Sequence, residues 1–151
     1  MRDLVSTYVF PNTLVVKKVN GRIIRAYLER CAQFWDIQDN KIIIEKSNDF
    51  PTPQYHNYDM LDGVEYTIKV SNPIGNRIIS LTRNGIPVKD DEEFTLCINN
   101  YRAAGGSGFE MLSEAETIQD IQVNVVEIIA DYIKKVQVID FEPVNNIQVI
   151  L

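Results

Sequence analysis

The strongest constraint on the fold comes from residues 64–88, where alternating segments are joined by tight turns. In VEYTIKV, one face of an extended chain would carry four apolar side chains, namely Val64, Tyr66, Ile68 and Val70. The NPIGN segment at 72–76 turns the chain into RIISLTR at 77–83, and Asn84-Gly85 is typical of a hairpin turn. We therefore expect antiparallel strands here.

The segment before this region combines a strand with an amphipathic helix. LVVKKV at 14–19 is β-branched and predicts a strand, and Asn20-Gly21 turns the chain into the helix. Apolar residues then recur at helical spacing at Ile23, Ile24, Tyr27, Leu28, Cys31, Phe34 and Trp35. This spacing predicts one helix through Trp35, with Cys31 and Trp35 in the core.

Further strands are predicted at KIIIEK (41–46), FTLCINNY (94–101) and NNIQVIL (145–151). Asp120 is the expected N-cap of a second helix that ends near Lys135. Its inward positions would be Val125, Val126, Ile129, Tyr132 and Ile133. Two main helices among about six strands indicate an α+β domain with a mixed, largely antiparallel sheet.

Size and charge limit the classes of function. The chain has 151 residues, 45% of them hydrophobic, which predicts a single domain over residues 1–151. The net charge of −6 argues against a nucleic-acid polymer as partner, and no apolar run reaches the roughly 20 residues of a membrane span. Residues 1–13, charged and partly helical in pattern, lack the features of a signal peptide.

The scarcity of metal ligands argues against metal-dependent hydrolysis by this chain alone. His56 is the single histidine, and Cys31 and Cys97 lie far apart without a CxxC spacing. Dinuclear phosphoesterase sites draw several imidazoles together with carboxylates. We therefore expect no self-contained metallohydrolase site in this chain, and no nucleophile-elbow motif accompanies His56.

Two segments are candidates for ligand binding. Tyr101 precedes a loop, RAAGGSGF, whose Gly105, Gly106 and Gly108 permit close backbone approach, although a plain turn is the alternative. The loop at 46–59 carries Tyr55, His56 and Tyr58, for which ordinary packing is the alternative. If Tyr58 and Tyr101 faced each other, a nucleobase would stack between them, each face contributing about 1–3 kcal/mol.

Several separated motifs carry a family resemblance that covers nearly the whole chain. They are YDMLDGVEYTIKVSNPIGNRI, NGIPVKDDEEFTLCINNYRAAGGSGFEML and the helix that ends in DYIKK, with RDLVSTYVFPNTLVVKKVNG and VNNIQVIL at the two ends. In this order they resemble the C-terminal domain of the 5'-nucleotidase family. NNYRAAGG is most similar to the bacterial branch of 2',3'-cyclic-nucleotide 2'-phosphodiesterases with 3'-nucleotidase activity.

This resemblance implies a division of labour. In such enzymes an N-terminal metallophosphoesterase domain holds two divalent metal ions and hydrolyses the phosphoester, while the C-terminal domain binds the nucleoside and moves it by interdomain rotation. The chain would be the second domain alone, inactive by itself, with a nucleotide and its own N-terminal domain as partners. The parent would be periplasmic, secreted or attached to the cell wall.

The resemblance also assigns roles to residues. Tyr101 and Tyr58 fall where the family places base-stacking aromatics, and His56 or Tyr55 would replace Tyr58 if the loop were shifted. Gly105, Gly106 and Ser107 fall in the substrate loop, where 5'-nucleotidases have a ribose-binding Asp in place of Ser107. A serine cannot bind the ribose hydroxyls through two charged oxygens as an aspartate does, and this difference favours the cyclic-phosphodiesterase branch.

The remaining alternatives concern Arg102 and the activity of the parent. Arg102 is either a surface charge or a supporting contact near the substrate, and no arginine is assigned to the phosphate. The leading hypothesis is a substrate-binding domain of a cyclic-nucleotide phosphodiesterase. A 5'-nucleotidase or UDP-sugar hydrolase domain and a non-catalytic interaction module are the alternatives.

Overall fold

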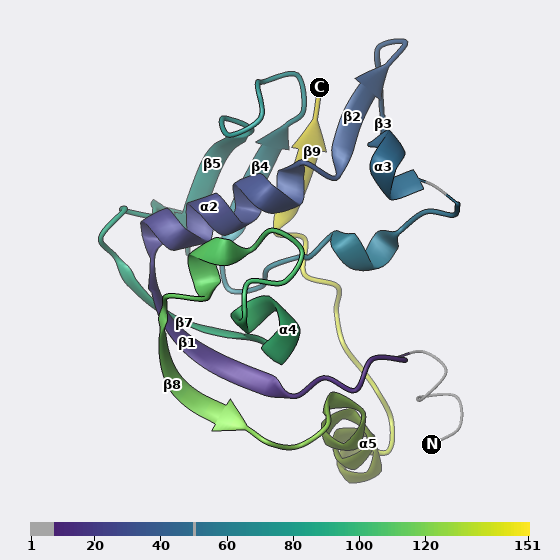
Figure 1. Cartoon of the computed structure of the whole chain (residues 1–151), viewed down its shortest axis with the longest axis vertical. Helices are drawn as coiled ribbons and strands as arrows, with labels where there is room; N and C mark the ends of the chain where they lie inside the picture. The colour runs from purple at the N-terminus through teal and green to yellow at the C-terminus, as the bar shows by residue number, and fades with distance from the viewer. Residues whose placement is uncertain (1–7, 50) are drawn as a thin grey trace. The chain divides into compact units, whose positions relative to one another are not determined.

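The computed structural model describes residues 8–49 and 51–151, which form two compact units (Figure 1). Unit 1 takes its described residues from 8–19 and 94–143, and unit 2 from 20–49, 51–93 and 144–151. Of the stretch 1–13, expected to be partly helical, residues 1–7 lie outside the described residues, and residues 8–13 form no helix, so the expectation is wrong there. The prediction of one domain over residues 1–151 stays a prediction.

Unit 2 is built on a four-stranded sheet in the order β6-β5-β4-β9. Its strands are β4 (Glu65–Lys69), β5 (Ile78–Arg83), β6 (Ile86–Pro87) and β9 (Ile147–Ile150). The β4-β5 and β5-β6 pairs are antiparallel, whereas β9 runs parallel to β4. Asn84 and Gly85 both have positive φ, as a type I′ hairpin requires, so the turn prediction is confirmed.

The alternation predicted for residues 64–70 is also confirmed. Val64, Tyr66, Ile68 and Val70 are all buried, at 4% exposure or less. Helix α2 (Gly21–Ala32) contributes the facing apolar stripe, whose buried members include Ile24, Leu28 and Cys31. The Arg25 guanidinium donates to the carbonyl of Ile78, and the Glu29 carboxylate accepts from the Ile78 amide, which ties the helix to β5.

Helix α2 ends earlier than the spacing predicts. Asn20 caps it by accepting from the Ile23 amide at 3.0 Å, but the helix stops at Ala32. Trp35 opens a strand, β2 (Trp35–Gln38), which pairs antiparallel with β3 (Lys41–Ile44) through a turn at Asp39-Asn40. The helical assignment of Phe34 and Trp35 is therefore wrong, and Trp35 is only partly buried. Cys31, at 1% exposure, is in the core as predicted.

The long loop of unit 2 contains two short helical turns, α3 (Lys46–Asp49) and the 3-10 turn η1 (Tyr55–Asn57). Neither turn is predicted from the sequence, because each is too short to show a helical period.

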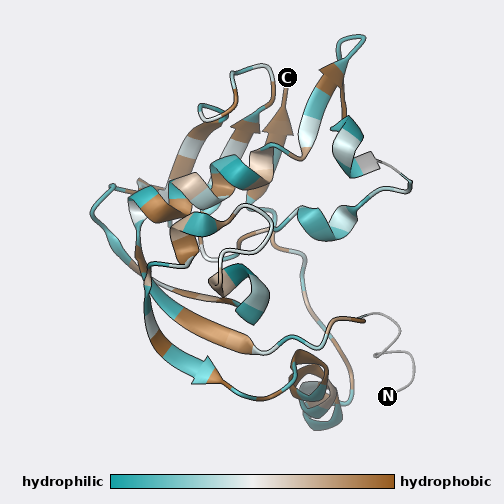
Figure 2. Ribbon diagram, viewed as in Figure 1, coloured by the Kyte–Doolittle hydropathy of each residue, from teal (hydrophilic) through white to brown (hydrophobic). Residues whose placement is uncertain are grey.

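Figure 2 shows hydrophilic residues on the β2-β3 turn and hydrophobic residues along β9, as expected for an exposed turn and a sheet strand.

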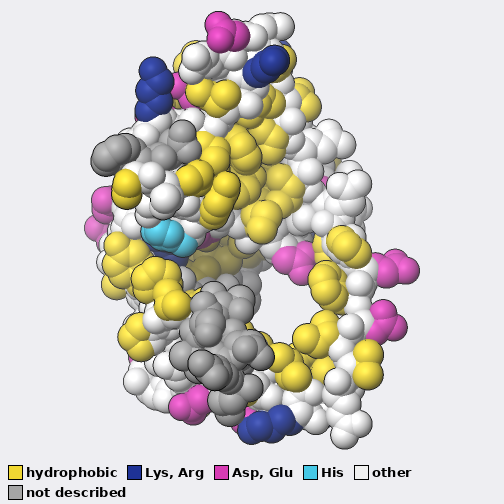
Figure 3. Space-filling model, turned by 90° about the vertical axis from the view of Figure 1, so that its right-hand side faces the viewer, with side chains coloured by type: hydrophobic (Ala, Val, Ile, Leu, Met, Phe, Trp, Pro, Cys, Tyr) yellow, Lys and Arg dark blue, Asp and Glu magenta, His cyan; other side chains and the backbone are white. Residues whose placement is uncertain are grey.

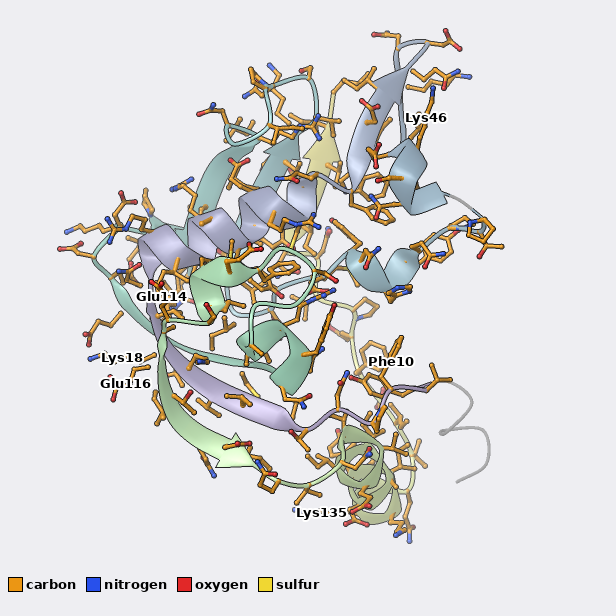
Figure 4. All side chains as sticks on the ribbon, in the orientation of Figure 1. Phe10, Lys18, Lys46, Glu114, Glu116 and Lys135 are labelled. Carbon is orange, nitrogen blue, oxygen red and sulfur yellow. The ribbon has the colours of Figure 1, made fainter. Side chains whose placement is uncertain are left out.

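Unit 1 holds a three-stranded sheet in the order β7-β1-β8. It comprises β1 (Leu14–Asn20), β7 (Glu93–Asn99) and β8 (Glu116–Ile121), and its helical segments are α4 (Asn100–Ala103), η2 (Glu110–Leu112) and α5 (Val125–Val136). In the antiparallel β1-β8 pair, Lys18 is the register partner of Glu116, and Figure 4 labels both at one end of this pair. The Lys17 ammonium is buried and donates to the carbonyl of Ala115 at 2.9 Å.

The second main helix begins later than predicted. Asp120 belongs to β8, where it pairs with Val15, and Asn124 caps α5 by accepting from the Val126 amide at 2.9 Å. Tyr132 is 57% exposed, so its inward assignment is also wrong. The chain nevertheless has the predicted α+β class, with two main helices, although its described strands form three sheets instead of one. No helix among the described residues is long and apolar enough to cross a membrane.

Candidate functional site: Tyr101 and the glycine-rich loop

Tyr101 lies in the first turn after β7, on the short segment α4. Asn99 caps this turn by accepting from the Arg102 amide at 2.8 Å. Asn100 is fixed to the chain before β1, because its amide donates to the Thr13 carbonyl and its side chain accepts from the Thr13 amide. The Tyr101 side chain is 53% exposed, so it lies outside the core as predicted, although on a helical turn and not on the strand.

The glycine-rich loop folds back onto the Tyr101 ring. A Cβ added to Gly106 would lie 2.5–2.6 Å from ring carbons Cζ, Cε1 and Cε2, which places this glycine against the ring face. The Gly106 amide donates to the Tyr101 carbonyl at 3.0 Å. Only a residue without a side chain allows this approach. The structure thus brings together the loop and the tyrosine that the sequence marks as candidates.

Ser107 completes this arrangement. Its Oγ lies 3.2 Å from the Tyr101 hydroxyl oxygen, a distance at which either group donates to the other. Ser107 also has a φ of 58°, in the left-handed region, between Gly105 at 90° and Gly108 at 83°. The hydroxyl contact with Tyr101 restrains the ring at its tip, while Gly106 restrains it at its face.

Arg102 is buried, at 5% exposure, so the interpretation as a surface charge is wrong. Its guanidinium carbon lies 4.6 Å from the centre of the Phe109 ring and 5.6 Å from that of Tyr101. One guanidinium nitrogen donates to the Gly106 carbonyl at 3.5 Å. Arg102 therefore supports the glycine-rich loop from inside unit 1.

Tyr58 belongs to unit 2 and has a different environment. Its ring centre lies 5.1 Å from that of Phe34 and 5.2 Å from that of Trp35, so it forms part of an aromatic cluster. Burial is the main reason that the pKa of the Tyr58 hydroxyl is raised, and a hydrogen-bonding contribution from Trp35 opposes it. The indole N–H of Trp35 is nevertheless buried without an acceptor in good hydrogen-bond geometry among the described residues.

The backbone around Tyr58 is fixed by its neighbours. The hydroxyl of Tyr27, a buried residue of α2, donates to the Asp59 carboxylate at 2.8 Å. The Tyr58 amide donates to the Tyr55 carbonyl at 3.1 Å, which closes the η1 turn. The chain is therefore fixed before Tyr58 by the η1 turn and after it by the bond between Tyr27 and Asp59.

The alternatives to Tyr58 lie on η1. Tyr55 is 68% exposed and His56 is also exposed, with the imidazole at the molecular surface in Figure 3. Neither position is selected or excluded as a stacking residue by this exposure. The stacking of a base between Tyr101 and any of these residues stays a prediction.

The support beneath the Tyr58 cluster is not predicted from the sequence. The buried Arg77 guanidinium donates to the carbonyls of Ala32 at 3.0 Å and Trp35 at 2.7 Å, and to that of Asn72 at 3.2 Å. These bonds hold the end of α2 and the start of β2, from which Phe34 and Trp35 reach Tyr58. The sequence signal, an arginine before an apolar strand, is too general to reveal this role.

Metal coordination does not fit the described residues. Among residues 8–49 and 51–151, no group of three or more His, Cys, Asp or Glu side chains lies close enough together to hold a metal ion. Neither Cys31, which is buried, nor Cys97, which is exposed, forms a disulfide. The chemistry that this arrangement supports is recognition of a planar group by an aromatic ring.

Known proteins share sequence and fold with this chain. Residues 1–114 match the model of the 5'-nucleotidase C-terminal domain. The chain is 38% identical over 120 residues to the 2',3'-cyclic-nucleotide 2'-phosphodiesterase/3'-nucleotidase of Salmonella typhimurium, covering 70% of this chain and 18% of that protein. It is 33% identical over 150 residues to the protein of the same name from Haemophilus influenzae, covering 88% and 22% respectively.

A solved structure extends the similarity to the whole chain. A Staphylococcus aureus protein assigned as a 5'-nucleotidase, crystallised with alpha-ketoglutarate, superimposes with a TM-score of 0.92 at 33% identity. The match covers 100% of this chain and 30% of the Staphylococcus protein. The chain thus spans about a fifth of the two curated relatives and under a third of the solved one.

Proposed function

The chain belongs to the family of 5'-nucleotidase C-terminal domains, and from this premise we propose that it binds the nucleoside part of a nucleotide substrate. We place its parent among the bacterial 2',3'-cyclic-nucleotide 2'-phosphodiesterases with 3'-nucleotidase activity. Two relatives of that name, at 38% and 33% identity, support this placement. The parent's substrates, its activity and its location in the periplasm, in the medium or at the cell wall all belong to the proposal.

The observation that carries the proposal is the restrained yet exposed ring of Tyr101. An aromatic side chain that is half exposed and fixed in orientation loses little further freedom when a base stacks on it. Gly106 holds one face of the ring and Ser107 holds its hydroxyl, so the base would stack on the remaining face. Base stacking on an aromatic side chain contributes about 1–3 kcal/mol and tolerates different bases.

Tyr58 is the proposed second stacking aromatic, with Tyr55 and His56 as alternatives. The Phe34 and Trp35 rings fix the Tyr58 ring in place, which suits a rigid binding surface. Gly105, Gly106 and Ser107 would line the substrate loop beside Tyr101. The Ser107 side chain, with its single hydroxyl, would then form one hydrogen bond with a ribose hydroxyl.

Hydrolysis is assigned to another domain of the parent. The family resemblance implies two divalent metal ions, yet the described residues contain no cluster that fits them. We propose that an N-terminal metallophosphoesterase domain supplies the metals and the reaction. The chain alone should then bind nucleotide without turning it over.

The similarity to the Staphylococcus aureus protein favours a second candidate, a 5'-nucleotidase or UDP-sugar hydrolase parent. Ser107 argues against it, because the resemblance places a ribose-binding Asp there in 5'-nucleotidases. Turnover of 2',3'-cyclic AMP and 5'-AMP by the full-length protein separates the two candidates. Faster hydrolysis of the cyclic nucleotide supports the leading proposal, and faster hydrolysis of 5'-AMP contradicts it.

A titration of the labelled chain with 3'-AMP, followed by NMR, tests the binding site. We expect a Kd of about 1 mM, equivalent to about −4 kcal/mol, with shifts at Tyr101, Tyr58 and residues 105–108. In the Tyr101→Leu variant these shifts should be absent, while the rest of the spectrum should remain that of a folded protein. If saturating nucleotide moves none of these resonances in the unchanged chain, the assignment is wrong and a non-catalytic interaction module becomes the better interpretation.

A further inference from the structure

Arg102 combines two features that are rarely found together, a charged head and almost complete burial. A buried charge is costly unless polar or π contacts replace its hydration. Arg102 has both kinds of contact, since its guanidinium lies near the Phe109 and Tyr101 rings and donates to the Gly106 carbonyl. All of these groups lie within residues 101–109.

These contacts connect the two parts of the candidate site. Tyr101 supplies the ring, Gly106 supplies the backbone against its face, and Arg102 contacts both residues. The Arg102 backbone takes part as well, because its carbonyl accepts from the Gly105 amide at 2.9 Å and its amide is bound by Asn99. A planar guanidinium stacks on a ring while donating at its edge, which an ammonium group cannot do.

We infer that Arg102 is a positioning residue that fixes the glycine-rich loop against the Tyr101 ring and so orients the ring for stacking. It acts from the buried side of the loop, through Phe109 and Gly106, and does not itself contact the nucleotide. Its use in nucleotide binding rests on the proposed function, whereas its effect on the loop is a property of the unliganded chain.

Amide hydrogen exchange at Gly106 in the unliganded chain tests the inference directly. This amide is bonded to the Tyr101 carbonyl, so it reports whether the loop is closed on the ring. Arg102→Met keeps an unbranched apolar side chain and removes the guanidinium. We expect exchange at Gly106 to become about tenfold faster, and the Kd for 3'-AMP to rise about tenfold if the closed loop is the binding-competent state.

Arg77→Met is the matched control, because Arg77 is also a buried arginine that donates to backbone carbonyls, but in unit 2. It should lower the stability of the chain without accelerating exchange at Gly106. If both variants accelerate exchange at Gly106 equally, the effect is general destabilisation and the inference is overturned.

Arg102→Lys provides a second variant in case Arg102→Met does not fold. It keeps the charge but lacks the planar fork, so we expect Gly106 exchange faster than in the unchanged chain. Unchanged exchange at Gly106 in the folded Arg102 variants overturns the inference. If the unchanged chain does not bind 3'-AMP, the proposed function fails, while the exchange rates still decide the role of Arg102.

Discussion

Tyr101 and Tyr58 were both candidate stacking residues, but their environments differ. Tyr101 is 53% exposed and rests on loop backbone, whereas Tyr58 is partly buried and packs in an aromatic cluster with Phe34 and Trp35. A ring that packs into a cluster of other rings contributes to folding stability. An exposed ring that rests on a fixed loop is available to a ligand. The difference suggests that Tyr58 combines a structural role with any binding role, while Tyr101 is free to serve binding alone.

Replacing each tyrosine by alanine should separate these roles most strongly. Tyr58→Ala leaves a gap beside Phe34 and Trp35, and we expect a loss of about 3 kcal/mol in unfolding free energy. Tyr101→Ala removes an exposed ring and should cost less than about 1 kcal/mol. Urea unfolding followed by circular dichroism measures both values, and Trp35 fluorescence reports on the Tyr58 cluster. Equal losses would contradict the comparison.

Gly106→Ala should show how closely the loop approaches Tyr101. The added Cβ would meet the ring at 2.5 Å, so the ring or the loop must shift, at a cost of about 1–3 kcal/mol. Urea unfolding of Gly106→Ala, Tyr101→Ala and the double variant forms a double-mutant cycle. The cost of the methyl group should largely vanish once the ring is absent. A cost that persists in the Tyr101→Ala background would show that the ring is not what Gly106 accommodates.

The burial of tyrosine hydroxyls in unit 2 predicts an alkaline loss of stability. Burial raises the pKa of Tyr58 and of Tyr66 above the ordinary value of 10.0. The folded chain therefore keeps protons that the unfolded chain loses near pH 10, so stability is full below pH 10 and falls as the pH rises above it. Unfolding free energies measured from pH 8 upward should show this fall, and Tyr58→Phe and Tyr66→Phe should each reduce it. An identical fall in a Tyr58→Phe/Tyr66→Phe double variant would rule out these hydroxyls as its source.

The smallest effect is expected at the tip of the Tyr101 ring. Ser107→Ala and Tyr101→Phe each remove the same exposed hydroxyl contact, and each should cost about 0.5 kcal/mol. Because they remove one interaction, the double variant should cost no more than either single variant. Thermal unfolding of the three variants measures this, and clearly additive losses would show that the two hydroxyls act separately.

The parts of the fold that local patterns determine were predicted from the sequence. Alternation identified the buried face of β4, and Asn84-Gly85 identified the hairpin after β5. Strand β8 was missed because its residues are almost all exposed, which leaves no apolar periodicity to detect. That omission also misplaced the N-cap of α5, which is Asn124 and not Asp120.

The same distinction between local and distant contacts applies to the candidate site. Tyr101 and Gly106 are five residues apart, so their proximity follows from the chain itself. The packing of Tyr58 on Phe34 and Trp35 joins residues more than twenty positions apart, and the helical spacing of residues 23–35 placed Trp35 in the wrong element. The burial of Arg102 depends on Phe109, which local sequence rules do not reveal.

The central claim is that a nucleobase stacks on Tyr101. Intermolecular nuclear Overhauser effects between 3'-AMP and this chain test it most directly, because they require protons within a few ångströms of each other. The account predicts contacts from the adenine H2 and H8 protons to the ring protons of Tyr101. If saturating 3'-AMP gives no intermolecular Overhauser effect to the ring of Tyr101, the claim is contradicted.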